Sequence, residues 1–265
     1  MKSVSPSVRH IMRQWLTVVA ILMAIALNGL SNVFPPAGQN VGEVSNTILG
    51  GVIITPANYA FAIWGLIYLG LIIYGVYQAL PGQRQNPVLA QVSWALIGAC
   101  VLQIVWLYAF LTTSFWLSVG LIVGILGCLI VAYLRSRTVT PTRQVRWLLQ
   151  APISIYFAWI TVATVVNVAG ALFDSFFSSG SAMSAIGVAS TVVMMGVSGA
   201  IAAAIALGYG DASFPAVVVW ALSAIAIRQA SIPPIAFTGV GLSVGLMVLI
   251  VRIVVTGQGR MRHSP

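Results

Sequence analysis

The chain has 265 residues, of which 60% are hydrophobic and only 6% charged, and its mean hydropathy is +1.03. A water-soluble domain of this composition would lack the polar surface needed to cover itself, so the sequence predicts an all-α polytopic membrane protein. The formal net charge of +9 comes from basic residues scattered among apolar segments, which argues against a nucleic-acid partner and favours membrane lipids with anionic headgroups.

Eight stretches are long and apolar enough to be predicted as membrane-spanning helices, because a spanning helix needs ~20 mostly apolar residues. Turn residues such as Pro35-Pro36, Pro81-Gly82 and Pro233-Pro234 separate them. In chain order, the predicted helices are 15–34, 56–80, 88–110, 115–134, 147–170, 184–208, 214–229 and 235–254. The seventh is the shortest.

The first predicted helix has an alternative interpretation as a signal peptide. A basic start, an apolar run and Ala24-Ile25-Ala26 together resemble a cleavable leader. The uncleaved helix is favoured, because its removal would leave the other helices with a poorer charge bias.

The distribution of Lys and Arg predicts the orientation, because these residues are retained on the cytoplasmic side of short loops. With eight crossings and a cytoplasmic N-terminus, only Arg228 falls on the outer side. The residues on the inner side are Lys2, Arg9, Arg13, Arg84, Arg135, Arg137, Arg143, Arg146, Arg252, Arg260 and Arg262. Both termini are therefore expected to be cytoplasmic, and a seven-helix count, which would move the last three outside, is disfavoured.

The second predicted helix carries an aromatic pair in a place where lipid would favour Leu. Pro56 suits the first turn of a helix, which would put Trp64 about two turns inside it. Trp64 and Tyr68 are spaced i and i+4 and so share one face.

The third and fifth predicted helices carry further aromatic and amide groups at helical spacing. Gln103 lies one turn from Trp106, and the fifth helix has aromatic, small and amide residues at spacings of three, four and four. Together these helices could line a pocket. The candidate ligand-binding residues are Trp64, Tyr68, Gln103, Tyr156, Trp159, Ala163 and Asn167.

Each candidate residue also has a packing interpretation. Trp and Tyr often anchor helix ends at the membrane interface, as expected for Trp15, Trp94, Trp116 and Trp147. Asn167 could hydrogen-bond a neighbouring helix. For each residue taken singly, spacing alone favours packing over ligand binding.

The last three predicted helices differ from the others, since they hold one Trp (Trp220) and many small residues. Small residues recur every four positions on one face of the sixth and eighth helices: Gly196, Ala200, Ala204 and Gly208, and Gly241 and Gly245. This spacing lets helix backbones approach closely in lipid, which favours helix packing and leaves a homodimer contact as the alternative.

The residues that usually hold metals or form disulfides are few. Cys100 and Cys128 each lie deep in an apolar run, and His10 and His263 lie in the two tails. Neither a disulfide framework nor a metal site is therefore expected. The sequence offers no buried acid–base pair and no Ser–His arrangement, so no catalytic residue is predicted.

Two segments resemble the TspO/MBR family, the tryptophan-rich sensory proteins that include the translocator (peripheral benzodiazepine receptor) proteins. The second helix of that family opens with paired prolines and carries a Trp followed four residues later by Tyr. Its fifth helix carries P-Y-x-x-W, then A-T and an Asn, and its third helix carries a Gln near the middle. The matching residues are Pro56, Trp64, Tyr68, Gln103, Tyr156, Trp159, Ala163, Thr164 and Asn167.

The chain departs from the family pattern at four positions. Thr55 stands where the first proline would be, and Asn58 stands where the family has another Trp. Ile155 replaces the proline of the fifth helix, and Leu107 lies approximately where an Asn follows the Gln.

The resemblance covers about residues 15–175. It implies a five-helix transmembrane domain over 1–175, which leaves residues 176–265 as a three-helix transmembrane extension. It further implies a sensor or translocator that binds a flat hydrophobic ligand, such as a porphyrin or a sterol-like molecule, under a lid formed by loop 35–55. Because no histidine lies near the implied cavity, free-base porphyrin stacked on Trp64 and Trp159 is expected rather than a histidine-ligated haem.

Two other classes of function stay open at this point. One is a facilitative transporter or permease for a neutral apolar solute, and the other is an assembly factor whose small-residue helices recruit membrane proteins. Ion-coupled transport is not expected, because it usually uses carboxylates within the membrane. Glu43, Asp174 and Asp211 all fall in loops or at helix ends.

Overall fold

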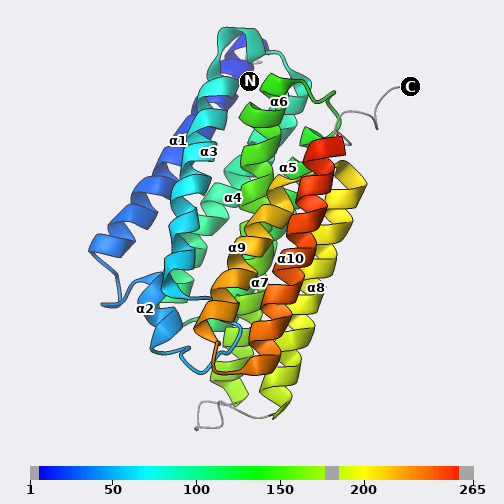
Figure 1. Cartoon of the computed structure of the whole chain (residues 1–265). Coiled ribbons are helices and arrows are strands. Elements are labelled where there is room, and N and C mark those ends of the chain that lie inside the picture. The colour runs from blue at the N-terminus through cyan, green and yellow to red at the C-terminus, as the bar shows by residue number, and fades with distance from the viewer. Residues whose placement is uncertain (1–5, 177–184, 257–265) are drawn as a thin grey trace.

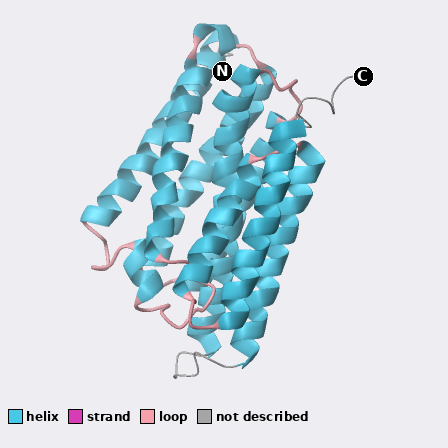
Figure 2. Ribbon diagram, in the orientation of Figure 1, coloured by secondary structure: helices cyan, strands magenta, loops and turns pink. Residues whose placement is uncertain are grey.

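The computed structural model describes residues 6–176 and 185–256, and within these ranges it contains helices and loops but no strand (Figure 2). Seven of its helices are long and apolar enough to cross a membrane, which confirms the predicted all-α polytopic membrane protein. Lys2, Ser184, Arg260, Arg262 and His263, on which some predictions rest, lie outside the described residues.

The helices follow one another along the chain with short connections (Figure 1). They are α1 (Pro6–Val33), α2 (Val41–Asn46), the 3-10 helix η1 (Asn58–Ala62), α3 (Ile63–Ala79), the 3-10 helix η2 (Pro81–Gln83), α4 (Pro87–Leu111), α5 (Phe115–Ser136), α6 (Arg143–Val145), the π-helix η3 (Arg146–Gln150), α7 (Ala151–Phe176), α8 (Ala185–Tyr209), α9 (Ser213–Arg228) and α10 (Pro233–Thr256). The eight predicted spans correspond to α1, α3, α4, α5, α7, α8, α9 and α10.

The shortest predicted span, 214–229, corresponds to α9, which is also the shortest of the eight helices that match predicted spans. With 16 residues, α9 is about 24 Å long at 1.5 Å per residue, less than the ~30 Å hydrocarbon core. It nevertheless runs along the bundle between α7 and α10, and α1 begins at the same end of the bundle at which α10 ends (Figure 1). The side of the membrane on which that end lies stays a prediction.

Five helices form a closed ring. In order around it, α1 packs against α3, α3 against α7, α7 against α5, α5 against α4, and α4 against α1. At the α3–α7 contact, a Cβ added to Gly70 would lie 3.2 Å from the Cβ of Pro152, so glycine permits the close approach.

The start of α1 differs from the prediction by nine residues, because polar side chains there find partners in the turn after α3. The Gln14 Nε2 donates to the carbonyl oxygens of Gln78 (2.7 Å) and Leu80 (3.2 Å). The Arg13 Nη2 donates to the carbonyl oxygen of Arg84 at 3.1 Å. A prediction based on hydropathy alone could not include these polar residues in the helix.

The second predicted helix also begins later than expected. Pro56 lies in a loop, residues 58–62 form the 3-10 helix η1, and α3 starts at Ile63. Trp64 is therefore the second residue of an α-helix rather than two turns inside one. The physical reason is that the carbonyl oxygen of Pro56 accepts a hydrogen bond from Arg228 Nη1 (3.2 Å) in α9, outside any helical ladder.

The last three helices form a layer against one side of the ring. They pack on one another, and α9 lies along α7. One close helix contact in this layer is at Gly239, where an added Cβ would lie 2.8 Å from the Cβ of Ala226 and 3.0 Å from the carbonyl oxygen of Leu222.

The predicted stripe of small residues does not make these contacts. Ala200, Ala204, Gly208, Gly241 and Gly245 are exposed, and within the described ranges no atom beyond the adjoining turns of the same helix lies within 4 Å of a Cβ added to any of these three glycines. Gly196, half-buried, has equally open surroundings. The packing interpretation of this stripe is therefore wrong within the chain, and the buried small residues lie on another face: Gly199, Ala202, Ala206 and Gly239.

A buried polar cluster joins this layer to the ring at the end of the bundle that carries the start of α1. Asp211, in the turn between α8 and α9, is 4% exposed. Its Oδ2 accepts hydrogen bonds from Tyr133 (3.0 Å) and Ser154 (2.6 Å) and pairs with Arg137. Its Oδ1 accepts from the Ser213 amide at 2.8 Å. Sequence reasoning placed Asp211 in a turn but could not predict this burial.

Candidate ligand-binding site

A small cavity of about 50 Å³ lies inside the ring beside α2, which Figure 1 shows at the end of the bundle opposite to the start of α1. Its lining comes from residues 41–56, η1, α3, α4 and α7, and includes none of the described residues of α8, α9 or α10. The described lining of the cavity therefore comes from the ring, from η1 and from the loop over residues 35–55 with the adjoining Pro56; this loop is called the lid below.

Four of the seven predicted site residues line this cavity: Trp64 from α3, and Trp159, Ala163 and Asn167 from α7. Trp64 and Trp159 thus reach one space from two different helices. Phe61 meets Trp159 edge-on, with ring centroids 6.2 Å apart and an interplanar angle of 84°.

The other three predicted residues, Tyr68, Gln103 and Tyr156, lie outside the cavity lining and form a hydrogen-bonded cluster. The Gln103 Nε2 donates to the Tyr68 hydroxyl at 3.1 Å, and the Tyr156 hydroxyl donates to Gln103 Oε1. Trp64 stacks on Tyr68 at 5.4 Å and meets Tyr156 edge-on at 6.2 Å. The cluster therefore holds the Trp64 side chain in place through its ring contacts with Tyr68 and Tyr156.

The Asn167 amide already has a protein partner. Its Nδ2 lies 3.0 Å from the Ser118 hydroxyl on α5, and that hydroxyl also donates to the Phe115 carbonyl oxygen at 2.7 Å. This contact ties α7 to α5, as the packing interpretation of Asn167 expects, while the side chain still borders the cavity.

Several lining residues were not among the predicted ones. Trp106 and Phe110 of α4 stack on each other with ring centroids 5.2 Å apart and border the cavity. Phe61 lies three residues before Trp64, and this helical spacing in the sequence would have indicated that the two side chains share a face. The lid residues Ser45 and Leu49 carry no comparable signal, because the six-residue helix α2 and the loop after it are too short to show a periodic pattern.

The lid has its own helix, α2, which a capping box stabilises. The Asn40 side chain accepts from the Glu43 amide (3.0 Å), and the Glu43 carboxylate accepts from the Asn40 amide (2.7 Å). Val44 and Leu49 point inward and are almost fully buried. Leu49 packs on α7, where a Cβ added to Gly170 would lie 2.9 Å from its Cδ1.

The outer side of the lid is held by α9. Arg228 donates to the Asn46 side chain of α2 as well as to the Pro56 carbonyl oxygen, and the Gln229 Nε2 donates to the Ile53 carbonyl oxygen at 2.8 Å. The Trp220 Nε1 donates to the carbonyl oxygen of Ala60 in η1 at 3.0 Å. The α9 end of the layer therefore supports the lid, although no described residue of the last three helices lines the cavity.

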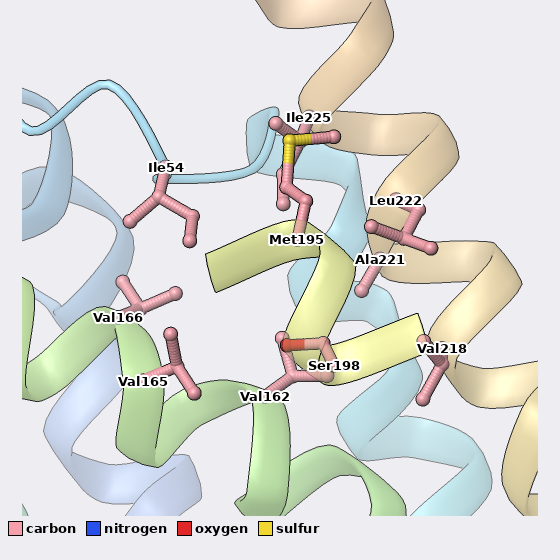
Figure 3. A pocket seen from close by; sticks show the side chains of 10 residues that line it. All are labelled: Ile54, Val162, Val165, Val166, Met195, Ser198, Val218, Ala221, Leu222 and Ile225. Atoms are coloured by element: carbon pink, nitrogen blue, oxygen red, sulfur yellow. The ribbon is translucent and has the colours of Figure 1, made fainter. Parts of the chain in front are cut away.

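Between the lid, α7 and the last helices the side chains are nearly close-packed. Figure 3 shows Ile54 of the lid facing Val162, Val165 and Val166 of α7, with Met195 of α8 beside them. The space left there is about 10 Å³, too small and too apolar for more than one water. This seam joins the parts of the protein and is not a ligand site.

A second, more polar chamber of about 370 Å³ adjoins the cavity. The two share Val41, Phe61, Trp64 and Trp106 as walls. Beyond these walls the chamber is lined mainly by polar side chains of α1, the lid and η1: Asn28, Asn32, Asn40, Glu43 and Asn58.

These features define a class of protein: a multi-pass helical membrane protein with a five-helix ring and an aromatic-lined cavity under a lid. The family model of the TSPO-like proteins matches residues 14–252, and the chain therefore belongs to this family. The match runs through both the ring and the last three helices, further than the residues on which the resemblance rested. No curated protein and no solved structure matches the chain.

Proposed function

We propose that this membrane protein binds a flat hydrophobic ligand, a tetrapyrrole or a sterol-like molecule, in the cavity under the lid and acts as a sensor or translocator for it. The observation that carries the proposal is that Trp64 and Trp159, from separate helices, border the same cavity. Aromatic walls of this kind suit a ligand with a flat face, since stacking on an aromatic side chain stabilises a bound heterocycle.

Ligand binding on this proposal requires the lid to move outward. The cavity of about 50 Å³ is far below the ~300–1,000 Å³ of typical ligand pockets. Ala163 leaves room between Trp159 and Asn167, but a ring system also needs the space that Ser45 and Leu49 of the lid now fill. The lid connects to α1 and η1 by loops, so it can shift without breaking a spanning helix.

The proposal is tested by replacing the two tryptophans with leucine and measuring the binding of protoporphyrin IX from its own absorbance and emission. Trp64→Leu and Trp159→Leu should each weaken binding by ~1–3 kcal/mol, the scale of an aromatic platform under a stacked ring. Leu keeps both positions apolar, so insertion and folding should survive.

Trp94→Leu is the matched control. Trp94 is 52% exposed and lines a shallow outer groove between α4 and α5, away from the cavity. If Trp64→Leu and Trp159→Leu bind protoporphyrin as tightly as Trp94→Leu does, the ligand does not occupy the cavity. If only Trp94→Leu weakens binding, the outer groove is the site.

A further inference from the structure

Two residues that line the cavity each carry a buried polar group with no hydrogen-bond partner among the described residues. These groups are the Nε1–H of Trp106 and the hydroxyl of Thr55. Trp106 is 7% exposed and Thr55 is 1% exposed, so bulk water does not solvate them. Buried donors of this kind are nearly always paired in folded proteins, because an unpaired one has lost its hydrogen bonds to water and gained none in return.

The other polar side chains around the cavity do not share this feature. Asn167 is paired with Ser118, and Tyr68, Gln103 and Tyr156 hydrogen-bond among themselves. Trp106 is also held in place, since it stacks on Phe110 and borders both the cavity and the polar chamber. Among the described residues that line the cavity, Trp106 and Thr55 are therefore the two whose buried polar groups still lack a partner that a bound molecule could supply.

The chemistry of these groups specifies what the molecule must carry. An indole N–H can only donate, so its partner must be a hydrogen-bond acceptor, whereas the Thr55 hydroxyl can donate or accept. A ligand made of hydrocarbon alone would leave both groups unpaired. An oxygen on the ligand would satisfy at least the Trp106 donor.

The charge of the site indicates that this oxygen is neutral. Among the described residues, neither chamber has a Lys, Arg or His in its lining, and the one charged lining residue is Glu43, an acid. A carboxylate brought into the cavity would lie there without a counter-ion, and burying an unpaired charge is far more costly than burying a carbonyl or ester oxygen. The asparagines of the polar chamber offer neutral hydrogen-bonding groups to a part of the ligand that extends beyond the cavity.

We propose that Trp106 and Thr55 select a neutral flat ligand whose carbonyl, ester or hydroxyl oxygen accepts from the Trp106 indole, and that the corresponding carboxylate ligands bind more weakly. This inference rests on the proposed function and narrows its ligand class. On this inference, Trp106 of α4 and Thr55 of the lid determine which ligands bind. Trp64 of α3 and Trp159 of α7 supply the surface on which the ligand stacks.

The experiment compares protoporphyrin IX, which carries two carboxylates, with its neutral dimethyl ester, which has the same ring and ester oxygens. The ester should bind the unaltered protein at least tenfold more tightly than the acid. Trp106→Phe keeps an aromatic ring beside Phe110 and removes only the donor, so it should weaken ester binding about tenfold, the equivalent of one buried hydrogen bond. Thr55→Val should weaken it in the same direction, and Trp94→Phe should leave it unchanged.

The outcomes separate this inference from the proposed function. If the acid binds as tightly as the ester, or if Trp106→Phe binds the ester as the unaltered protein does, the inference is wrong while ligand binding stands. The second result would mean that a water satisfies the indole. If neither porphyrin nor the neutral steroid ketone progesterone binds, the proposed function and the inference both fail.

Discussion

The guanidinium of Arg228, at the end of α9, donates a hydrogen bond to the side chain of Asn46 in the lid helix α2, across 182 residues of sequence. It also donates to the Pro56 carbonyl oxygen, just before η1. One arginine thus holds both the helix of the lid and the segment that leads from the lid into the ring.

Replacing Arg228 with methionine should loosen the lid, because Met keeps an apolar stem but cannot donate to Asn46 or Pro56. Hydrogen exchange measures this directly at Leu49 and Val52, whose amides are bonded within the lid. Both amides should exchange faster in Arg228→Met. Arg252→Met, at an exposed position of α10, is the control. Equal exchange in the two variants would show that Arg228 does not hold the lid.

Replacing Asp211 with alanine should destabilise the whole bundle. Arg137 is 13% exposed and would lose its carboxylate, and removing one member of a buried pair typically costs ~3–5 kcal/mol. Tyr133 and Ser154 would lose an acceptor as well. Thermal unfolding in detergent measures the effect, with the exposed Asp174→Ala as the control. An equal midpoint for the two variants would mean that the cluster does not join the last helices to the ring.

The orientation predicted from Lys and Arg can be tested with reporter fusions. One reporter placed after Pro265 and another inserted at Gly38, in the loop before α2, should report opposite sides of the membrane, with the C-terminal reporter in the cytoplasm. The start of α1 and the end of α10 lie at the same end of the bundle (Figure 1). Signals from the same side at both reporters would contradict eight crossings.

Hydropathy predicted the spanning helices, because each needs a long apolar run. It could not predict which face of each helix packs inward, since lipid and protein interior are both apolar and helices such as α4 and α8 are apolar all round. This is why the stripe through Ala200 and Ala204 was misplaced, whereas Trp159 and Ala163 were placed on the cavity side by a motif of the family.

The features missed altogether depend on contacts between segments far apart in the chain. The late start of α3 depends on Pro56 meeting Arg228, and the burial of Asp211 depends on Tyr133, Arg137 and Ser154 arriving from two other helices. The unpaired Trp106 is likewise visible only once its surroundings are assembled. Such contacts have no local signal in a single sequence.

The central claim, that the ligand occupies the cavity under the lid, is tested most directly by filling that cavity from inside. Ala163 borders it between Trp159 and Asn167, so Ala163→Leu would place a larger apolar side chain where the ligand should lie. Ala200→Leu, at an exposed position of α8, adds the same atoms outside the cavity. The account predicts that Ala163→Leu lowers the affinity for protoporphyrin IX dimethyl ester at least tenfold while Ala200→Leu leaves it unchanged. Equal affinity in the two variants, with both folded, would contradict it.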